Sequence, residues 1–151
     1  MTAPAARTVL AFDYGLRRIG IAVGNTLTGT AEPLLTVAAH AGEPEWPSVL
    51  RCVAQWQPAV LVVGVPYNAQ AGDARLTAAA QRFAAQLGER SGLEVQLVDE
   101  RLSSSAAESE LRERRRSGAR PRRVRRGDVD REAACLLLLQ WLRDRPEPRA
   151  V

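Results

Sequence analysis

The chain has few of the residues on which many active sites are built. His40 is its single histidine, which leaves almost nothing for a zinc site or a Ser-His-Asp triad. Its two cysteines, Cys52 and Cys135, both fall within apolar helical patterns. We therefore expect reduced, buried, structural thiols, as is usual in a reducing compartment.

Long hydrophobic runs are also missing. The run of four leucines at 136–139 is too short to span a bilayer, and the first apolar run is short and contains Asp13. We therefore expect a cytoplasmic protein without a membrane segment or a signal peptide. A length of 151 residues favours one domain, predicted over 8–144, with a disordered tail at 1–7 and a second tail at 145–151.

Positive charge is concentrated in one stretch of the sequence. Residues 112–126 contain nine arginines and one acid, Glu113, whereas the rest of the chain carries twelve of the 21 basic residues and sixteen of the 17 acidic ones. Such a stretch can neutralise phosphates, which is the main source of sequence-independent nucleic-acid affinity. It predicts phosphate contacts from Arg122, Arg123, Arg125 and Arg126. The alternative is a solvated basic loop that binds nothing specific.

The apolar pattern predicts an α/β fold. Strands are expected at 8–13, 19–24 and 32–38 as an antiparallel meander, and buried strands at 59–66 and 93–98. Helices are expected at 44–57, at 73–88, from Ser103 or Ser104 to about 115, and at 128–143, with a loop over 116–127. This order implies a mixed five-stranded sheet with helices on both faces. The tryptophans Trp46, Trp56 and Trp141 lie on helical stripes and are expected in the core.

Three acids fall at the ends of predicted elements. Asp13 and Glu100 lie at the carboxyl ends of predicted strands, which is where sites in open α/β sheets form. In the last helix, the positions that share a face with Asp130 are apolar, which predicts that this face meets the sheet. Asp128 is better explained as a helix N-cap after Gly127. We therefore choose Asp130 as the third acid.

Three such carboxylates suit a hard divalent cation. Oxygen ligands without histidine or cysteine favour Mg²⁺ or Mn²⁺, and such ions can hydrolyse a phosphodiester by activating water and relieving charge on the leaving oxygen. Each acid also has an ordinary explanation. Asp13 alone could be a cap or turn residue, and Asp99 with Glu100 and Arg101 could form a surface ion-pair cluster.

Four ordered motifs resemble the YqgF/RuvX family over about 8–142. They are the FDYG and RIGIAV segments around Asp13 and Arg18, the VGVPYN segment before Gly72, the VDERLSS block around Glu100, and the VDREAA start of the last helix at Asp130. The resemblance implies an RNase H-like fold related to RuvC. It also implies a nuclease that trims the 5′ end of the 16S rRNA precursor, with Asp13, Glu100 and Asp130 as catalytic metal ligands.

Two departures from related patterns stand out. Unlike the RuvC pattern, the 59–66 strand ends without a carboxylate, so the second acid must come from Glu100 on the next strand. Ser103 and Ser104 stand where the family often has threonine, which keeps the hydroxyl. One tightly held metal pair or one weakly held ion are both compatible with this arrangement.

Substrate contacts are expected beyond the basic stretch. The candidates are Arg17, Arg18, Asn68, Arg101 and Ser104. Arg101 has the alternative role of orienting Glu100 or pairing with Asp99, and Asn68 that of forming a turn. The expected partner is nucleic acid: RNA, structured nucleic acid or single-stranded DNA, bound by a monomer or weak homodimer.

Three other functions remain open from the sequence. A Holliday-junction resolvase would use the same chemistry but needs a dimer, and no dimer face is identifiable. A binding factor without catalysis would use the arginine stretch alone. An actin-like nucleotide-binding protein shares a strand followed by Asp-Tyr-Gly, but needs two lobes where 151 residues supply one.

Overall fold

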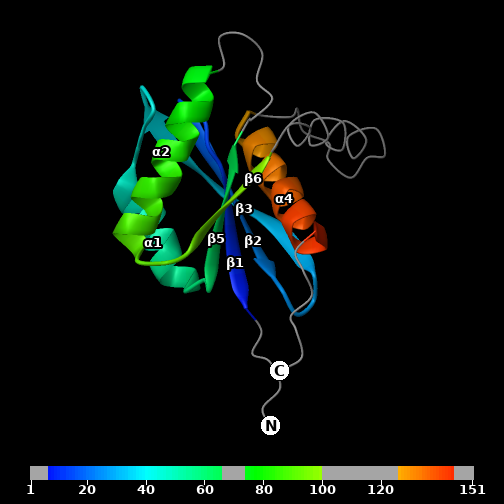
Figure 1. Cartoon of the computed structure of the whole chain (residues 1–151). Helices are drawn as coiled ribbons and strands as arrows, with labels where there is room; N and C mark the ends of the chain where they lie inside the picture. Colours follow the sequence, from blue (N-terminus) through cyan, green and yellow to red (C-terminus); the bar gives the residue numbers. More distant parts are fainter. Residues whose placement is uncertain (1–6, 66–73, 100–125, 145–151) are drawn as a thin grey trace, which may run out of the picture.

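The computed structural model describes residues 7–65, 74–99 and 126–144, which form a single sheet with helices on both faces (Figure 1). The strands are β1 (Thr8–Asp13), β2 (Arg18–Asn25), β3 (Thr30–His40), β4 (Glu43–Pro44), β5 (Val60–Val65) and β6 (Val95–Asp99). The helices are α1 (Trp46–Trp56), α2 (Ala74–Ser91) and α4 (Arg126–Asp144). Outside the described residues lie 1–6 and 145–151 of the expected tails, the loop expected at 67–72, the helix expected from 103 or 104 to about 115, and 116–125 of the next expected loop. The last two residues of that loop, 126 and 127, belong to α4 instead.

The sheet is mixed, as predicted, with the strand order β4-β3-β2-β1-β5-β6. Strands β1 to β4 pair in antiparallel fashion, and β1, β5 and β6 run parallel. It has six strands instead of the expected five, because Glu43 and Pro44 pair with the end of β3. A two-residue strand has no periodicity of its own, so no sequence pattern indicates it. The helix expected from 44 accordingly begins at Trp46.

One strand prediction was wrong in its burial. The 93–98 segment was expected to be buried, but β6 is the outermost strand and is partly exposed, with Leu97 44% exposed. Burial on both faces requires neighbours that only the topology supplies. Strand β5, by contrast, is buried along its whole length between β1 and β6, as its continuous apolar run predicted.

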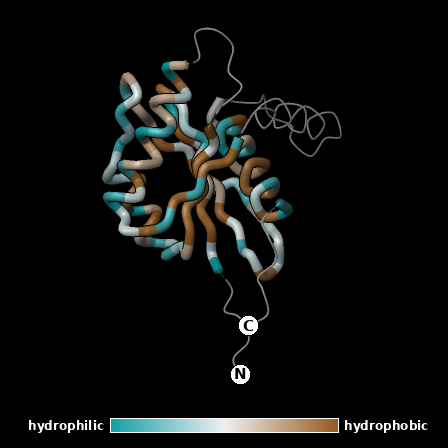
Figure 2. The backbone as a smooth tube through the Cα atoms, viewed as in Figure 1, coloured by the Kyte–Doolittle hydropathy of each residue, from teal (hydrophilic) through white to brown (hydrophobic). Residues whose placement is uncertain are grey.

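The sheet separates two hydrophobic clusters. Figure 2 shows hydrophobic residues concentrated along the central strands. Because side chains alternate along a strand, Leu10 and Phe12 of β1 face α1 and α2, as does Tyr14 just after the strand, whereas Val9 and Ala11 face α4. The first cluster is rich in aromatic rings, and the second consists of small and aliphatic side chains. Figure 1 shows the same division, with α1 and α2 on one face and α4 on the other.

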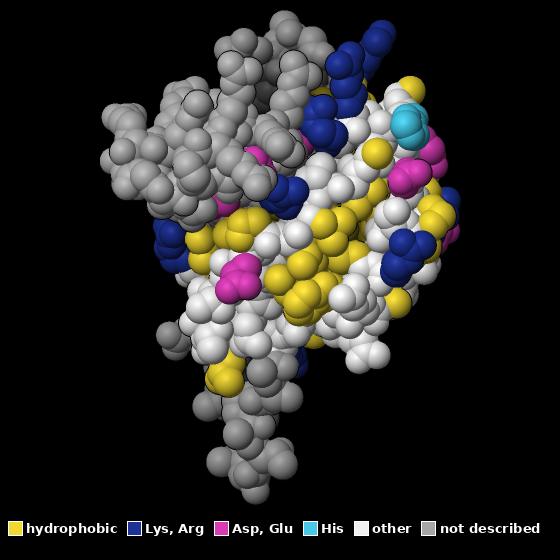
Figure 3. Space-filling model, turned by 180° about the vertical axis from the view of Figure 1, so that it is seen from behind, with side chains coloured by type: hydrophobic (Ala, Val, Ile, Leu, Met, Phe, Trp, Pro, Cys, Tyr) yellow, Lys and Arg dark blue, Asp and Glu magenta, His cyan; other side chains and the backbone are white. Residues whose placement is uncertain are grey.

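The far edge of the sheet is largely unpaired within the described residues. Strand β4 pairs only with Ala39 and His40, which leaves most of the outer edge of β3 without a partner strand. Pro33 and a register shift between β2 and β3 interrupt this edge, and both features discourage pairing with other chains. Seen from behind, apolar side chains cover the middle of the molecule, with charged side chains around them (Figure 3).

The tryptophans and cysteines only partly follow the predictions. Trp46 is buried and stacks on Phe83 with the ring centroids 5.5 Å apart, and Trp141 is half-buried. Trp56, expected in the core, is 36% exposed because it occupies the last position of α1. Both cysteines are buried and free, as predicted, and burial raises the pKa of Cys52 to about 11. No helix in the described ranges is both long and apolar enough to cross a membrane.

Candidate active site

Asp13 lies at the carboxyl end of β1, in the centre of the sheet. It pairs with Gly20 of β2 on one side and Gly64 of β5 on the other. Val9 and Ala11 pack against α4, so the alternation of the strand puts Asp13 on the same face. Neither neighbour has a side chain, so space above them is open to the backbone of α4.

The first turn of α4 uses that space. A Cβ atom built on Gly20 would lie 2.0 Å from the carbonyl oxygen of Asp130 and 2.9 Å from the amide nitrogen of Arg131. The helix backbone therefore rests directly on β2. Since Gly20 is the partner of Asp13, this contact brings Asp130 to the residue pair that carries Asp13. Two of the three predicted acids thus come from distant parts of the sequence to one end of the sheet.

The rest of α4 keeps this position. Ala133, Ala134, Leu137 and Leu138 are buried against the sheet, which confirms the face chosen for Asp130. A Cβ on Gly24 would lie 2.7 Å from a methyl carbon of Leu138, so β2 accommodates the helix at a second glycine.

Asp128 was wrongly expected to be the N-cap. The helix begins at Arg126, and Asp128 is a buried residue of its first turn that forms an ion pair with Arg131. The N-cap is the residue just before the first helical residue. Because Gly127 lies inside α4, it was a misleading signal for the start of the helix. Asp128 and Glu132, which is also buried, are the two buried acids among the described residues, and the sequence analysis gave neither a role in the site.

Arg18 links the two halves of the site. Its Nε donates a hydrogen bond of 2.8 Å to Oδ2 of Asp130, and the two side chains are 35% and 23% exposed. Half-exposed ion pairs contribute little stability. The bond does fix the orientation of the Asp130 carboxylate from β2. Arg18 was expected to bind substrate phosphate; in the structure it contacts a predicted metal ligand. Arg17 is exposed, and its carbonyl oxygen accepts a hydrogen bond from Ala39.

The third acid falls just beyond the described part of the chain. Asp99 pairs with Val65 at the end of β6, and Glu100 follows it outside the described residues. Within the described ranges, no group of three metal-ligating side chains gathers. The predicted contacts Asn68, Arg101, Ser104, Arg122, Arg123 and Arg125 also lie outside these ranges. Arg126 begins α4, but its side chain is outside them too.

The turn after Asp13 is held by contacts that the sequence analysis missed. The buried Tyr14 hydroxyl donates a 2.6 Å hydrogen bond to the carbonyl oxygen of Gly42, and the Gly42 amide donates to the carbonyl of Leu16. Burial raises the pKa of Tyr14, although the charge of nearby Arg82 opposes the shift. The phenol therefore stays protonated as a donor. A glycine between two isoleucines of a predicted strand was the one available sequence signal for the Gly20 contact.

Comparison with known proteins gives a consistent result. A family model described as "RuvX: Holliday junction resolvase" matches residues 7–144. A protein of Legionella pneumophila (strain Philadelphia 1) named "Putative pre-16S rRNA nuclease" is 44% identical over 133 residues, which cover 88% of this chain and 93% of the relative. A protein of the same name from Actinobacillus succinogenes is 40% identical, with 93% and 97% covered.

Solved structures agree on the fold. RuvC of T. thermophilus in complex with a Holliday junction substrate matches with a TM-score of 0.58 and 18% identity, covering 91% of this chain and 95% of that one. The fowlpox virus Holliday junction resolvase matches with a TM-score of 0.56 and 14% identity, covering 90% and 98%. At these identities the likeness concerns the fold alone. It confirms the RNase H-like fold that the motifs implied.

Proposed function

The chain belongs to the RuvX family, and from this premise we propose that it is a divalent-metal-dependent nuclease that hydrolyses phosphodiester bonds in pre-16S rRNA. The observation that carries the proposal is the contact between the backbone of Asp130 and Gly20 at the carboxyl end of β1, beside Asp13. Gly20 is the strand partner of Asp13 and lies under the backbone of Asp130. Substrate and site assignments below rest on this arrangement.

Glu100 is proposed as the third carboxylate. Val98 of β6 packs with the α4 cluster, so if the alternation of β6 continues, residue 100 projects toward the same face as Asp13. Strands β1, β5 and β6 are parallel, so their carboxyl ends meet at one edge of the sheet. This supports a site assembled from two strand ends and the first turn of α4.

The donor set fits Mg²⁺ or Mn²⁺. Asp13 and Asp130 offer hard carboxylate oxygens, the ligands that Mg²⁺ and Mn²⁺ prefer. Bound there, the ion would activate water and neutralise charge on the leaving oxygen. Arg18 holds Oδ2 of Asp130 and leaves its other oxygen for the cation. The chain itself would thus orient the ligands, and the arginine stretch at 112–126 is proposed to hold the substrate backbone.

The test compares cleavage of labelled pre-16S rRNA, single-stranded RNA and four-way junction DNA with Mg²⁺, Mn²⁺ or EDTA. We expect cleavage of the precursor RNA that needs a divalent ion and falls by roughly 10²–10³-fold or more in Asp13→Asn and Glu100→Gln, because each removes a charged ligand. Cleavage that EDTA does not reduce, or wild-type activity in both variants, would contradict the proposal.

Matched controls separate the site from general charge effects. Glu94→Gln makes the same chemical change at the other end of the β6 segment, and Asp144→Asn does so at the other end of α4; both side chains are exposed. Both controls should keep wild-type activity. Junction DNA cleaved in preference to RNA would instead favour the resolvase activity in the family description. Binding without cleavage in the wild type would favour a non-catalytic binding factor.

A further inference from the structure

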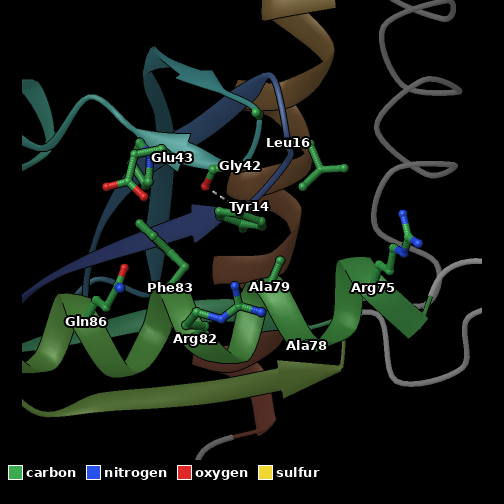
Figure 4. A pocket seen from close by; sticks show the side chains of 12 residues that line it. Tyr14, Leu16, Gly42, Glu43, Arg75, Ala78, Ala79, Arg82, Phe83 and Gln86 are labelled. Carbon is green, nitrogen blue, oxygen red and sulfur yellow. Dashed lines mark hydrogen bonds between the residues drawn. The ribbon is translucent and has the colours of Figure 1, made fainter.

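A cavity of about 350 Å³ lies on the opposite face of the sheet from Asp130 (Figure 4). Its wall on the strand side comes from the β1–β2 turn at Tyr14 and Leu16, and from the Ala41–Pro44 segment. Its other wall is α2, which presents Arg75, Arg82 and Gln86 around the small side chains of Ala78 and Ala79. No residue of the candidate active site lines it.

The cavity has a fixed shape. Gly42 has a φ of 86°, and the adjacent Ala41 has a φ of 51°, a conformation that costs energy for a residue with a side chain. A Cβ on Gly42 would lie 3.1 Å from the Tyr14 hydroxyl oxygen and 3.3 Å from a methyl carbon of Leu16. The Tyr14 and Leu16 hydrogen bonds to Gly42 hold this turn against β1. The wall is therefore built by contacts among its own residues.

The cavity is also charged. Arg75 and Arg82 are seven residues apart, so they lie on the same side of α2, about 10 Å apart along its axis. Both are exposed, and neither forms an ion pair with any described residue. Glu43 borders the same space and its Oε1 accepts a 3.2 Å hydrogen bond from Trp46, so two guanidinium groups stand against one carboxylate there. Two guanidinium groups over a concave surface, without an ion pair in the described ranges, favour an anionic ligand.

The cavity and the acidic site are joined through one peptide unit. Asp13 faces α4, and the next residue, Tyr14, faces α2 and lines the cavity. Both lie at the carboxyl end of β1, so a nucleic-acid strand with one phosphate at Asp13 has a short route past the β1–β2 turn to the arginines. The volume is of the order found for small-ligand pockets, roughly 300–1,000 Å³.

We propose that this cavity binds a nucleotide of the substrate strand next to the cleaved bond, with Arg82 and Arg75 contacting its phosphate. The proposal rests on the function proposed above. It assigns substrate binding to the α2 face, where Tyr14 of the FDYG segment lies but where the sequence analysis predicted no substrate contact. A separate mononucleotide would present the same phosphate chemistry, so the experiment must distinguish a strand from a free nucleotide.

The first test measures oligonucleotide binding by fluorescence anisotropy with Asp13→Asn, which should bind without cutting. Adding Arg82→Ala should weaken binding about 3–10-fold and reduce the slope of log K against log salt by about 1, as expected for one lost phosphate contact. Adding Arg51→Ala removes an equally exposed arginine from α1, away from the cavity, and should change the Kd less than 2-fold. Equal effects of the two changes would overturn the proposal.

The second test separates the cavity from general electrostatics. Ala78→Phe fills the space from an exposed position without changing charge, so it should fold normally and weaken binding of the strand by a similar factor. Unchanged binding in this variant would also overturn the proposal. AMP or inorganic phosphate could instead bind saturably in a way that depends on Arg82, while Arg82→Ala leaves strand binding unchanged. That result would also overturn the proposal, because it would assign the cavity to a free ligand.

The two proposals can fail separately. If Arg82→Ala and Ala78→Phe lose affinity for the strand while the wild-type protein cleaves no substrate, the cavity proposal is supported and the nuclease proposal is contradicted. Normal metal-dependent cleavage with unchanged affinity in both variants would support the nuclease and contradict the cavity.

Discussion

The two faces of the sheet are packed in different ways. On the α4 face, strand glycines at Gly20 and Gly24 let the helix come into direct contact with β2. On the α1 and α2 face, the rings of Phe12, Tyr14 and Phe83 fill the interior, with the centroids of Tyr14 and Phe83 5.1 Å apart. Close backbone contact gives the first face its geometry, and side-chain volume gives the second its core.

This difference explains where each proposed site lies. Catalytic carboxylates need fixed positions, and a backbone resting on a strand has little freedom to shift. A phosphate-binding cavity needs room. On the α2 face, open space lies next to the packed rings, between α2 and residues 41–44. The α4 face should therefore be much less tolerant of added atoms than the α2 face.

The largest effect is expected from Gly20→Ala. The new methyl group would overlap the Asp130 carbonyl oxygen, so α4 must move away from β2. We expect a loss of about 3 kcal/mol in the free energy of unfolding, because overpacking against backbone is poorly relieved. Cleavage should fall with it, since Asp130 moves. Denaturant unfolding and the cleavage assay would measure both; a stable, active variant would show that the two faces do not differ as argued.

A smaller effect is expected from Tyr14→Phe on the other face. The ring packing stays, but the carbonyl of Gly42 loses its buried donor, which should cost about 1–2 kcal/mol. Because burial raises the pKa of Tyr14, this stability is fully present below pH 10 and is lost as the pH rises through the raised value. Unfolding measured at pH 7 and above pH 10 should show the difference between wild type and variant shrinking at high pH. A constant difference would rule out the hydroxyl as its source.

The smallest effect, and one of opposite sign, is expected from Gly88→Ala in α2. The added methyl group would meet Val95 at 3.4 Å, an ordinary contact, and alanine favours a helix over glycine. We expect a gain of about 0.5–1 kcal/mol in the same unfolding assay and unchanged cleavage. A loss as large as that of Gly20→Ala would remove the contrast between the faces.

Local patterns predicted most of the described elements. Strand β1 was predicted with the bounds it has, and the bounds of β2, β5 and α4 were within two residues. Alternation and helical periodicity are properties of short segments, so they can be read without the fold. The same periodicity identified the face of α4 that carries Asp130. The positions of Asp13 and Asp130 at one end of the sheet were therefore within reach of sequence reasoning.

Other features depended on partners far away in the chain. The short strand β4, the exposure of β6, the role of Gly20 and the cavity behind Tyr14 each arise from segments that meet only in three dimensions. Arg18 was read as a phosphate ligand because the sequence does not show that Asp130 lies 2.8 Å away. Glu100 remains a prediction, because it lies outside the described residues.

For this protein, the sequence by itself determined which segments form strands and helices and which acids end them, because those choices depend on neighbours a few residues away. Only the tertiary structure decided that α4 rests on a glycine beside Asp13, and that Tyr14 turns toward a separate cavity lined by arginines. Those contacts join residues more than a hundred positions apart in one case and about sixty in the other, and no local periodicity records such distances.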